Sequence, residues 1–205
     1  IFEASSMSIP GLSSDAYSGD IVLLNAQYDT ETQPVDQNTK KIIVEAAGAE
    51  KLNVNSYVSS DDVTYNRSII SLSRYGSSVS PYLYSAKWII FPMTFCVETE
   101  ENVSSHNFYL VYDKENTAND DNTMVLRLRH TSTEDADKEK TVVTRYRAFN
   151  IANVVSRFEG TKLKTIKIIV PEQTGDSPKI EEGSNNGYKD ATYTINDYDK
   201  YVTNN

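Results

Sequence analysis

The chain has 205 residues, of which 39% are hydrophobic and 14 are tyrosine, which is enough to build one large or two small packed domains. Its 20 basic and 29 acidic residues give a net charge of −9, which repels phosphate backbones and argues against nucleic-acid binding. The longest apolar runs, 88–92 and 166–170, are too short to span a membrane. This composition is typical of a soluble extracytoplasmic protein.

The single cysteine, Cys96, excludes an intramolecular disulfide and a cysteine-based zinc cluster. It lies in a predicted strand in which Met93, Phe95 and Val97 alternate with more polar residues. If those three side chains face the core, Cys96 lies on the less buried side. We interpret it as a small structural residue rather than a reactive thiol.

Residues 1–19 are rich in serine and glycine, which predicts a leader or tether rather than part of a core. The chain begins with Ile1 rather than Met, so we expect its natural start, with any signal peptide or lipid-bearing cysteine, to precede this residue.

A series of short strands follows, with turn-forming residues between them. These strands are predicted at residues 20–29, 40–47, 52–58 and 67–75. Their spacing of about 8–12 residues is typical of a barrel or sandwich. The sequence GSSVS, just before Pro81, is the best internal boundary, so we predict one domain at residues 20–80 and a second at 81–205.

The second half centres on a predicted hairpin with strands at 106–113 and 123–130, which flank an acidic loop. Alternation places Leu126 and Leu128 on a core face. Arg127 and Arg129 then face water or an acidic neighbour, as a cationic pair on the exposed face of the hairpin. Further strands are predicted at 88–98, 141–149 and 163–170, with 192–202 as a last edge strand or an extended tail.

One short helix is predicted at residues 150–160, because four apolar residues fall at helical spacing there. Asn150 can cap its start, and Gly160 can end it in the left-handed conformation. We interpret the apolar stripe as core rather than as a partner site; it consists of Ile151, Val154, Val155 and Phe158.

Metal and cofactor signals are weak. His106 and His130 begin and end the hairpin and so can lie near each other, but their spacing supplies no further ligands. The acidic clusters at 119–121 and 134–137 do not fit the calcium-loop template, which would need a glutamate where Tyr146 stands. The sequence therefore predicts structural or exposed histidines, no metal site and no cofactor. It also contains no phosphate-binding glycine loop and no hydrolase motif.

An aromatic set is the best candidate for ligand binding. Tyr82, Tyr84 and Trp88 share one strand face if the chain stays extended through residues 85–87. Such a platform can stack on sugar rings, although packing in a core or at a domain interface is the alternative.

The order of elements over residues 88–170 resembles the NigD-like proteins, predicted lipoproteins of gut and oral Bacteroidetes. The matching pieces are WIIFPMTFCVE, NFYLVYD, LRLRH, AFNIANVV and IKIIV, of which LRLRH is the most characteristic. The resemblance implies a small N-terminal OB-like barrel, a C-terminal Ig-like β-sandwich, and lipid anchoring at an outer membrane or secretion. It implies no catalytic residues, and the tail at 172–205 departs from the pattern. The family takes its name from proximity to a bacteriocin gene cluster, which leaves an immunity role open.

We therefore predict an all-β protein that binds an envelope protein or a glycan, without catalysis. The candidate binding residues are Tyr82, Tyr84, Trp88, Arg127 and Arg129. One alternative is a glycan-active hydrolase, in which two carboxylates should converge in a concave site, one of them with a raised pKa. Another is a purely structural subunit of a surface assembly.

Overall fold

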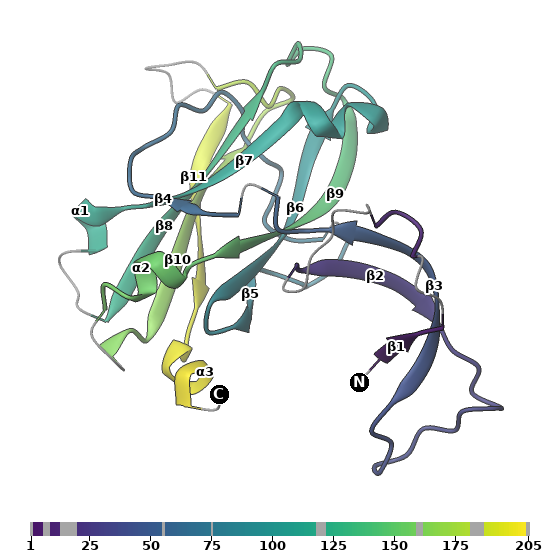
Figure 1. Cartoon of the computed structure of the whole chain (residues 1–205). Coiled ribbons are helices and arrows are strands. Elements are labelled where there is room, and N and C mark those ends of the chain that lie inside the picture. Colours follow the sequence, from purple (N-terminus) through teal and green to yellow (C-terminus); the bar gives the residue numbers. More distant parts are fainter. Residues whose placement is uncertain are drawn as a thin grey trace. The chain divides into compact units, whose positions relative to one another are not determined.

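The computed structural model describes residues 2–5, 9–12, 20–54, 56–74, 76–117, 122–158, 162–180 and 187–203. It divides into two compact units, Ile1–Val54 and Asn55–Asn205, whose elements are labelled in Figure 1. The regular secondary structure of both units is mainly strand, which confirms the predicted all-β class. Within the described residues, no helix is long and apolar enough to cross a membrane.

The first unit contains one three-stranded sheet. Its strands are β1 (Phe2–Ala4), β2 (Val22–Gln27) and β3 (Ile42–Lys51), in the order β1-β3-β2. Strand β1 runs parallel to β3 and β2 runs antiparallel to it, with a register shift between Asn25 and Ala26. The described strands form an open sheet and not the closed OB-like barrel that the resemblance implied. One physical reason is that β3 runs unbroken to Lys51, where we predicted a turn into another strand.

The second unit is a sandwich of two sheets, as predicted. A five-stranded sheet has the order β11-β10-β8-β7-β4, and a three-stranded sheet has the order β5-β6-β9. The strands are β4 (Val58–Ser59), β5 (Tyr82–Ser85), β6 (Trp88–Val97), β7 (His106–Tyr112), β8 (Thr123–Ser132), β9 (Thr141–Asn150), β10 (Thr165–Gln173) and β11 (Tyr188–Ile195). The helical elements are η1 (Glu100–Ser105), α1 (Lys114–Thr117), α2 (Ala152–Val155) and α3 (Tyr198–Thr203).

The core lies between the inner faces of these two sheets. Phe91 and Phe95 on β6 pack into one hydrophobic cluster with Leu126 and Leu128 on β8, and all four side chains are fully buried. The predicted hairpin is present as β7 and β8, paired antiparallel from His106↔Ser132 onward. Its core-facing alternation therefore follows the sequence pattern.

The predicted orientation of β6 is also confirmed. Met93, Phe95 and Val97 are fully buried in the core, whereas Cys96 keeps 7% of its surface exposed on the opposite face. Burial raises the pKa of the Cys96 thiol, which suits a structural residue.

The predicted strand at 67–75 is wrong, because this segment crosses from one sheet to the other. Ile69 bridges to Glu172 on β10, and Ser71 bridges to Thr94 on β6. A chain that pairs with both sheets in turn makes single bridges rather than a ladder. These contacts also tie residues 56–74 to the second unit. The two units thus divide at Val54 and not at the predicted boundary of residue 80.

The predicted helix is present only as α2, one turn long. The Asn150 side chain accepts a hydrogen bond from the Ala152 amide at 3.0 Å, but the N-cap position of α2 is held by the next residue, Ile151. Ile151 and Val154 are fully buried in the core cluster, which confirms the core interpretation of the stripe. Gly160 lies outside the described residues.

The tail joins the sandwich. β11 pairs antiparallel with β10 from Ile166↔Ile195 to Gln173↔Tyr188, as the edge strand of the larger sheet (Figure 1). In the following α3, the Tyr198 side chain is buried and its hydroxyl donates to the Ala86 carbonyl at 2.6 Å.

Tyr193 on β11 anchors this tail to the crossing segment. Its hydroxyl donates to Glu172 and accepts from the Leu72 amide at 3.1 Å. Replacing Tyr193 by phenylalanine leaves both partners without this bond, so Tyr193→Phe should lower the free energy of unfolding by about 1 kcal/mol. Urea unfolding at neutral pH measures the loss. The exposed Tyr84→Phe is the control and should leave stability unchanged.

The same bond predicts a pH dependence. Burial, followed by the Glu172 hydrogen bond, raises the pKa of Tyr193 from 10.0 to about 12. Because the folded pKa is the higher one, the stabilising contribution is complete below pH 10 and is lost between pH 10 and pH 12. The stability difference between wild type and Tyr193→Phe should therefore shrink over this range. A difference that stays constant would show that Tyr193 does not titrate as expected.

Candidate functional site

A cluster of buried polar side chains lies at the open end of the β7–β8 hairpin. Strand β7 begins at His106, and β8 ends at Ser132 opposite it. The chain then enters a charged loop that carries Glu134 and Glu139 before β9 begins. The crossing segment reaches the same place, because Arg67 bridges to His130.

Two histidines form the inner part of this cluster, and both are buried. The Nδ1 atom of His106 lies 2.9 Å from Nε2 of His130, and Nδ1 of His130 lies 3.2 Å from the Ser68 carbonyl oxygen. The His130 ring stacks on Phe108 with 4.2 Å between centroids. Burial, followed by repulsion from His106, holds the pKa of His130 well below its ordinary value, so this imidazole is neutral.

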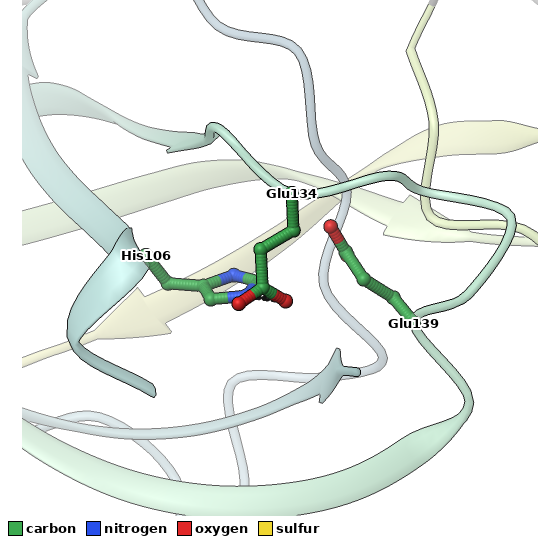
Figure 2. Close-up of side chains that lie close together, drawn as sticks. All are labelled: His106, Glu134 and Glu139. Atoms are coloured by element: carbon green, nitrogen blue, oxygen red, sulfur yellow. Dashed lines mark hydrogen bonds and ion pairs between the residues drawn. The ribbon is translucent and has the colours of Figure 1, made fainter. Parts of the chain in front are cut away.

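Two carboxylates form the outer part; in Figure 2 the Glu134 carboxylate lies against the His106 ring, and Glu139 approaches from the other side of Glu134. An oxygen of Glu134, Oε2, lies 3.4 Å from Nε2 of His106 and accepts the Glu98 amide at 3.1 Å. Glu139 is fully buried, and its Oε1 accepts from Nε of Arg67 at 2.8 Å. Burial acts to raise the pKa of Glu134, but hydrogen bonds, first from the Glu98 amide, lower it overall.

The cluster has the chemistry of a metal-ligand set. His106, Glu134 and Glu139 each offer one ligand atom, and these atoms lie within 4.8 Å of one another. We predicted neighbouring histidines at the hairpin's open end, but we missed the two glutamates. The register of the hairpin could have suggested Glu134, two residues beyond Ser132. Nothing in the charged loop distinguishes Glu139 from a solvated acidic residue.

The predicted arginines lie on the opposite face of β8, in a pocket of about 400 Å³. Arg129 is 6% exposed, so it is buried and not on an exposed face as predicted. It binds both carboxylate oxygens of Asp62, at 2.9 and 3.1 Å, and packs over the Tyr65 ring. Arg127, whose side chain is 25% exposed, donates to Asp113 at 2.6 Å. Both arginines thus have an acidic neighbour, which was one of the two environments we expected.

The aromatic set does not form a continuous platform with Trp88. The chain turns at residues 86–87 instead of staying extended, so Trp88 begins the antiparallel neighbour β6. Tyr82 and Tyr84 are 43% and 63% exposed on β5. They belong to the smaller sheet, whereas Arg127 and Arg129 belong to the larger one, so the five candidate residues do not form one site.

Comparison with known proteins identifies solved structures that share this fold. No family model matches the chain, and no curated protein matches it. A solved structure of a "putative lipoprotein" from Bacteroides fragilis is similar, with a TM-score of 0.72 and 19% identity over 95% of this chain and 87% of the other. A NigD-like immunity protein from Bacteroides caccae has a TM-score of 0.52 and 16% identity, with 85% and 74% of the two chains covered.

The chain has the fold of the NigD-like proteins. This confirms the resemblance seen in residues 88–170 at the level of structure. A protein of unknown function from Bacteroides vulgatus also shares the fold, with a TM-score of 0.53 and 12% identity, over 95% of this chain and 78% of the other. The likeness extends beyond the NigD-like segment of the sequence, because it includes the first unit and the tail.

The buried Arg67–Glu139 ion pair predicts a large effect of a single substitution. The two side chains are 5% and 0% exposed. Arg67→Met leaves the Glu139 carboxylate buried without its cation, so the free energy of unfolding should fall by about 3–5 kcal/mol. Urea unfolding with an unchanged denaturant slope measures this loss.

The double variant Arg67→Met/Glu139→Met is the control for this prediction. It removes both charges, so it should recover much of the stability lost in the single variant. Recovery should be incomplete, because Arg67 also donates to the carbonyls of Asn66 and Glu134. A single variant as stable as wild type would mean that water, rather than Arg67, compensates the Glu139 charge.

Proposed function

We propose that this protein is an extracytoplasmic, envelope-associated protein that acts by binding a neutral glycan in the pocket beside Arg127 and Arg129. Support for the location is the shared fold with a "putative lipoprotein" and a NigD-like immunity protein. Support for binding rather than catalysis comes from the groups that line the pocket.

The observation that carries the proposal is charge balance within the pocket. Three carboxylates face three cations there; these residues are Asp62, Asp113, Glu115, Lys114, Arg127 and Arg129. A pocket whose charges balance has little net attraction for an ion, and its two arginine–carboxylate pairs supply fixed donors and acceptors. Sugar hydroxyls both donate and accept, so they match such a lining. The volume of about 400 Å³ is within the range of small-ligand sites.

The pocket is less well suited to glycoside hydrolysis. A general acid at neutral pH requires a carboxyl group with a raised pKa. The pKa of Asp62 is instead lowered, chiefly by its hydrogen bond from Arg129. A carboxylate that arginine holds in place is suited to accept hydrogen bonds in a fixed geometry and not to donate a proton.

A protein partner is the competing function. It would favour the exposed aromatic residues Tyr82 and Tyr84, since exposed aromatics are enriched at protein interfaces. These side chains are on the other sheet, so variants separate the two possibilities.

The test is a thermal-shift screen of the purified chain against neutral hexose oligosaccharides and uronic-acid oligomers. A ligand at about a hundred times its dissociation constant stabilises the folded state by roughly 2.7 kcal/mol. We expect a shift with a neutral oligosaccharide that depends little on salt, because the pocket is charge-balanced.

Arg127→Ala should weaken this binding by about tenfold or more, since a hydrogen bond to a charged group contributes about 1.5–3 kcal/mol. Arg145→Ala is the matched control, because Arg145 is a partly exposed arginine on β9 of the other sheet. No shift with any glycan, together with an envelope protein whose capture is lost in Tyr84→Ala, would replace this proposal by protein recognition.

A further inference from the structure

The hydrogen bonds of the two buried histidines determine which atom of His106 carries a lone pair. The Ser68 carbonyl can only accept, so Nδ1 of His130 carries the proton and Nε2 of the neutral ring accepts. The Nδ1 atom of His106 must then donate to it. In a neutral His106 ring, the lone pair is therefore on Nε2, which faces the Glu134 carboxylate.

This arrangement brings two acceptors together. The His106 Nε2 and Glu134 Oε2 atoms are 3.4 Å apart, and neither has a proton to give when the ring is neutral. Ser132 offers a hydroxyl at 3.5 Å from Nε2, at the limit of hydrogen bonding. A positive species between the two acceptors would remove the conflict.

The two carboxylates also have buried oxygen atoms whose hydrogen-bonding capacity is not used. Among the described residues, Glu134 Oε1 and Glu139 Oε2 are buried and lack a hydrogen-bond partner. Glu139 is fully buried, and the Glu134 side chain is 6% exposed. Arg67 supplies one positive charge to this cluster, through its ion pair with Glu139. Buried carboxylate oxygens in this state require a cation or a proton.

We propose that His106, Glu134 and Glu139 bind a divalent transition-metal ion, with Zn²⁺ the best match to one imidazole nitrogen and two carboxylates. Zinc takes such donors at about 2.0–2.2 Å in tetrahedral geometry, which places neighbouring ligand atoms about 3.3 Å apart. The 3.4 Å between His106 and Glu134 fits this spacing. Calcium and magnesium prefer oxygen ligands alone, so the imidazole disfavours them.

The surrounding residues support the ligands as they do in established metal sites. A metal-binding histidine usually donates its other ring nitrogen to an acceptor, which fixes the ring. His130 is that acceptor, and Ser68 in turn fixes His130. Arg67 holds Glu139 through its other oxygen. A surface pocket of about 510 Å³ borders the cluster and is lined in part by Arg67, Ser132 and Glu134.

The competing explanation is a proton shared between His106 and Glu134. An imidazolium at His106 would donate to both His130 and Glu134, which removes the conflict between the two acceptors. It would leave Glu134 Oε1 and Glu139 Oε2 without a hydrogen-bond partner. A metal ion that Glu139 binds through Oε2 would satisfy that oxygen, which the shared proton does not. The experiment must therefore distinguish a bound metal from a bound proton.

The test uses the 205-residue chain, stripped with a chelator and dialysed. Titration with Zn²⁺ should show one ion per chain. At a free concentration about a hundred times the dissociation constant, Tm should rise by about 5–10 °C. Ca²⁺ and Mg²⁺ at the same concentration should give no comparable rise. Co²⁺ should give a visible absorption spectrum typical of four-coordinate nitrogen and oxygen ligands, which Zn²⁺ then abolishes.

Variants assign the site. Glu139→Gln keeps the size of the side chain and an oxygen for Arg67, and it should weaken Zn²⁺ binding at least a hundredfold. Asp137→Asn is the matched control, because Asp137 is an exposed carboxylate that lines the same pocket. It should bind Zn²⁺ as wild type does.

Three results would overturn the proposal. One is a wild-type chain that binds neither Zn²⁺ nor Co²⁺, with nitrogen NMR shifts that show His106 as an imidazolium. Another is equal loss of binding in Asp137→Asn and Glu139→Gln, which indicates loose binding to the acidic loop. The third applies if the Glu139→Gln variant does not fold. In that case, a wild-type Co²⁺ spectrum that shows no nitrogen ligand would exclude the site without the use of any variant.

Discussion

The burial of Arg67 is the constraint on which this part of the fold depends. Its side chain is almost fully buried, and a buried guanidinium must be paired because its desolvation is costly. It donates to Glu139, to the Asn66 carbonyl and to the Glu134 carbonyl. These bonds hold the crossing segment against the loop between β8 and β9. Neither segment forms a continuous series of strand hydrogen bonds here, so the bonds of this one buried cation fix the path of both segments.

Sequence periodicity predicted the elements whose environment is the same along their length. The sequences of β7, β8 and β6 alternate because one face of each strand packs on a continuous core, although β6 and β8 are buried at nearly every position. Residues 67–74 alternate as well, but their partners change from β10 to β6 within a few residues. The local sequence pattern indicates that a side chain is buried, but it does not indicate which sheet buries it. The crossing segment was therefore mistaken for a strand.

The candidate sites show the same limit with charged residues. Arg129 has the sequence pattern of an exposed residue, yet a carboxylate 67 positions away covers it. Glu139 stands in a loop whose composition is typical of a solvated surface, yet Arg67 pairs with it from 72 positions away. Each ion pair joins residues far apart in the chain, and no local spacing encodes such a pair. The histidines could be placed together because a hairpin fixes their separation through a single local register.

Strand β8 borders both proposed sites, one on each of its faces. Its outer face presents Arg127 and Arg129 to the polar pocket, while its inner face presents His130 to the buried cluster. Hydrogen bonding to β7 and β10 on either side makes this strand hard to displace.

Residues 62–68, which include the start of the crossing segment, touch both sites without such support. Asp62 and Tyr65 contact Arg129, and a few residues later Arg67 and Ser68 contact the histidine–glutamate cluster. Because its bridges are isolated, this segment can shift at lower cost than β8. Any energetic coupling between the two sites would act through this segment, and by linkage it would be equal in both directions.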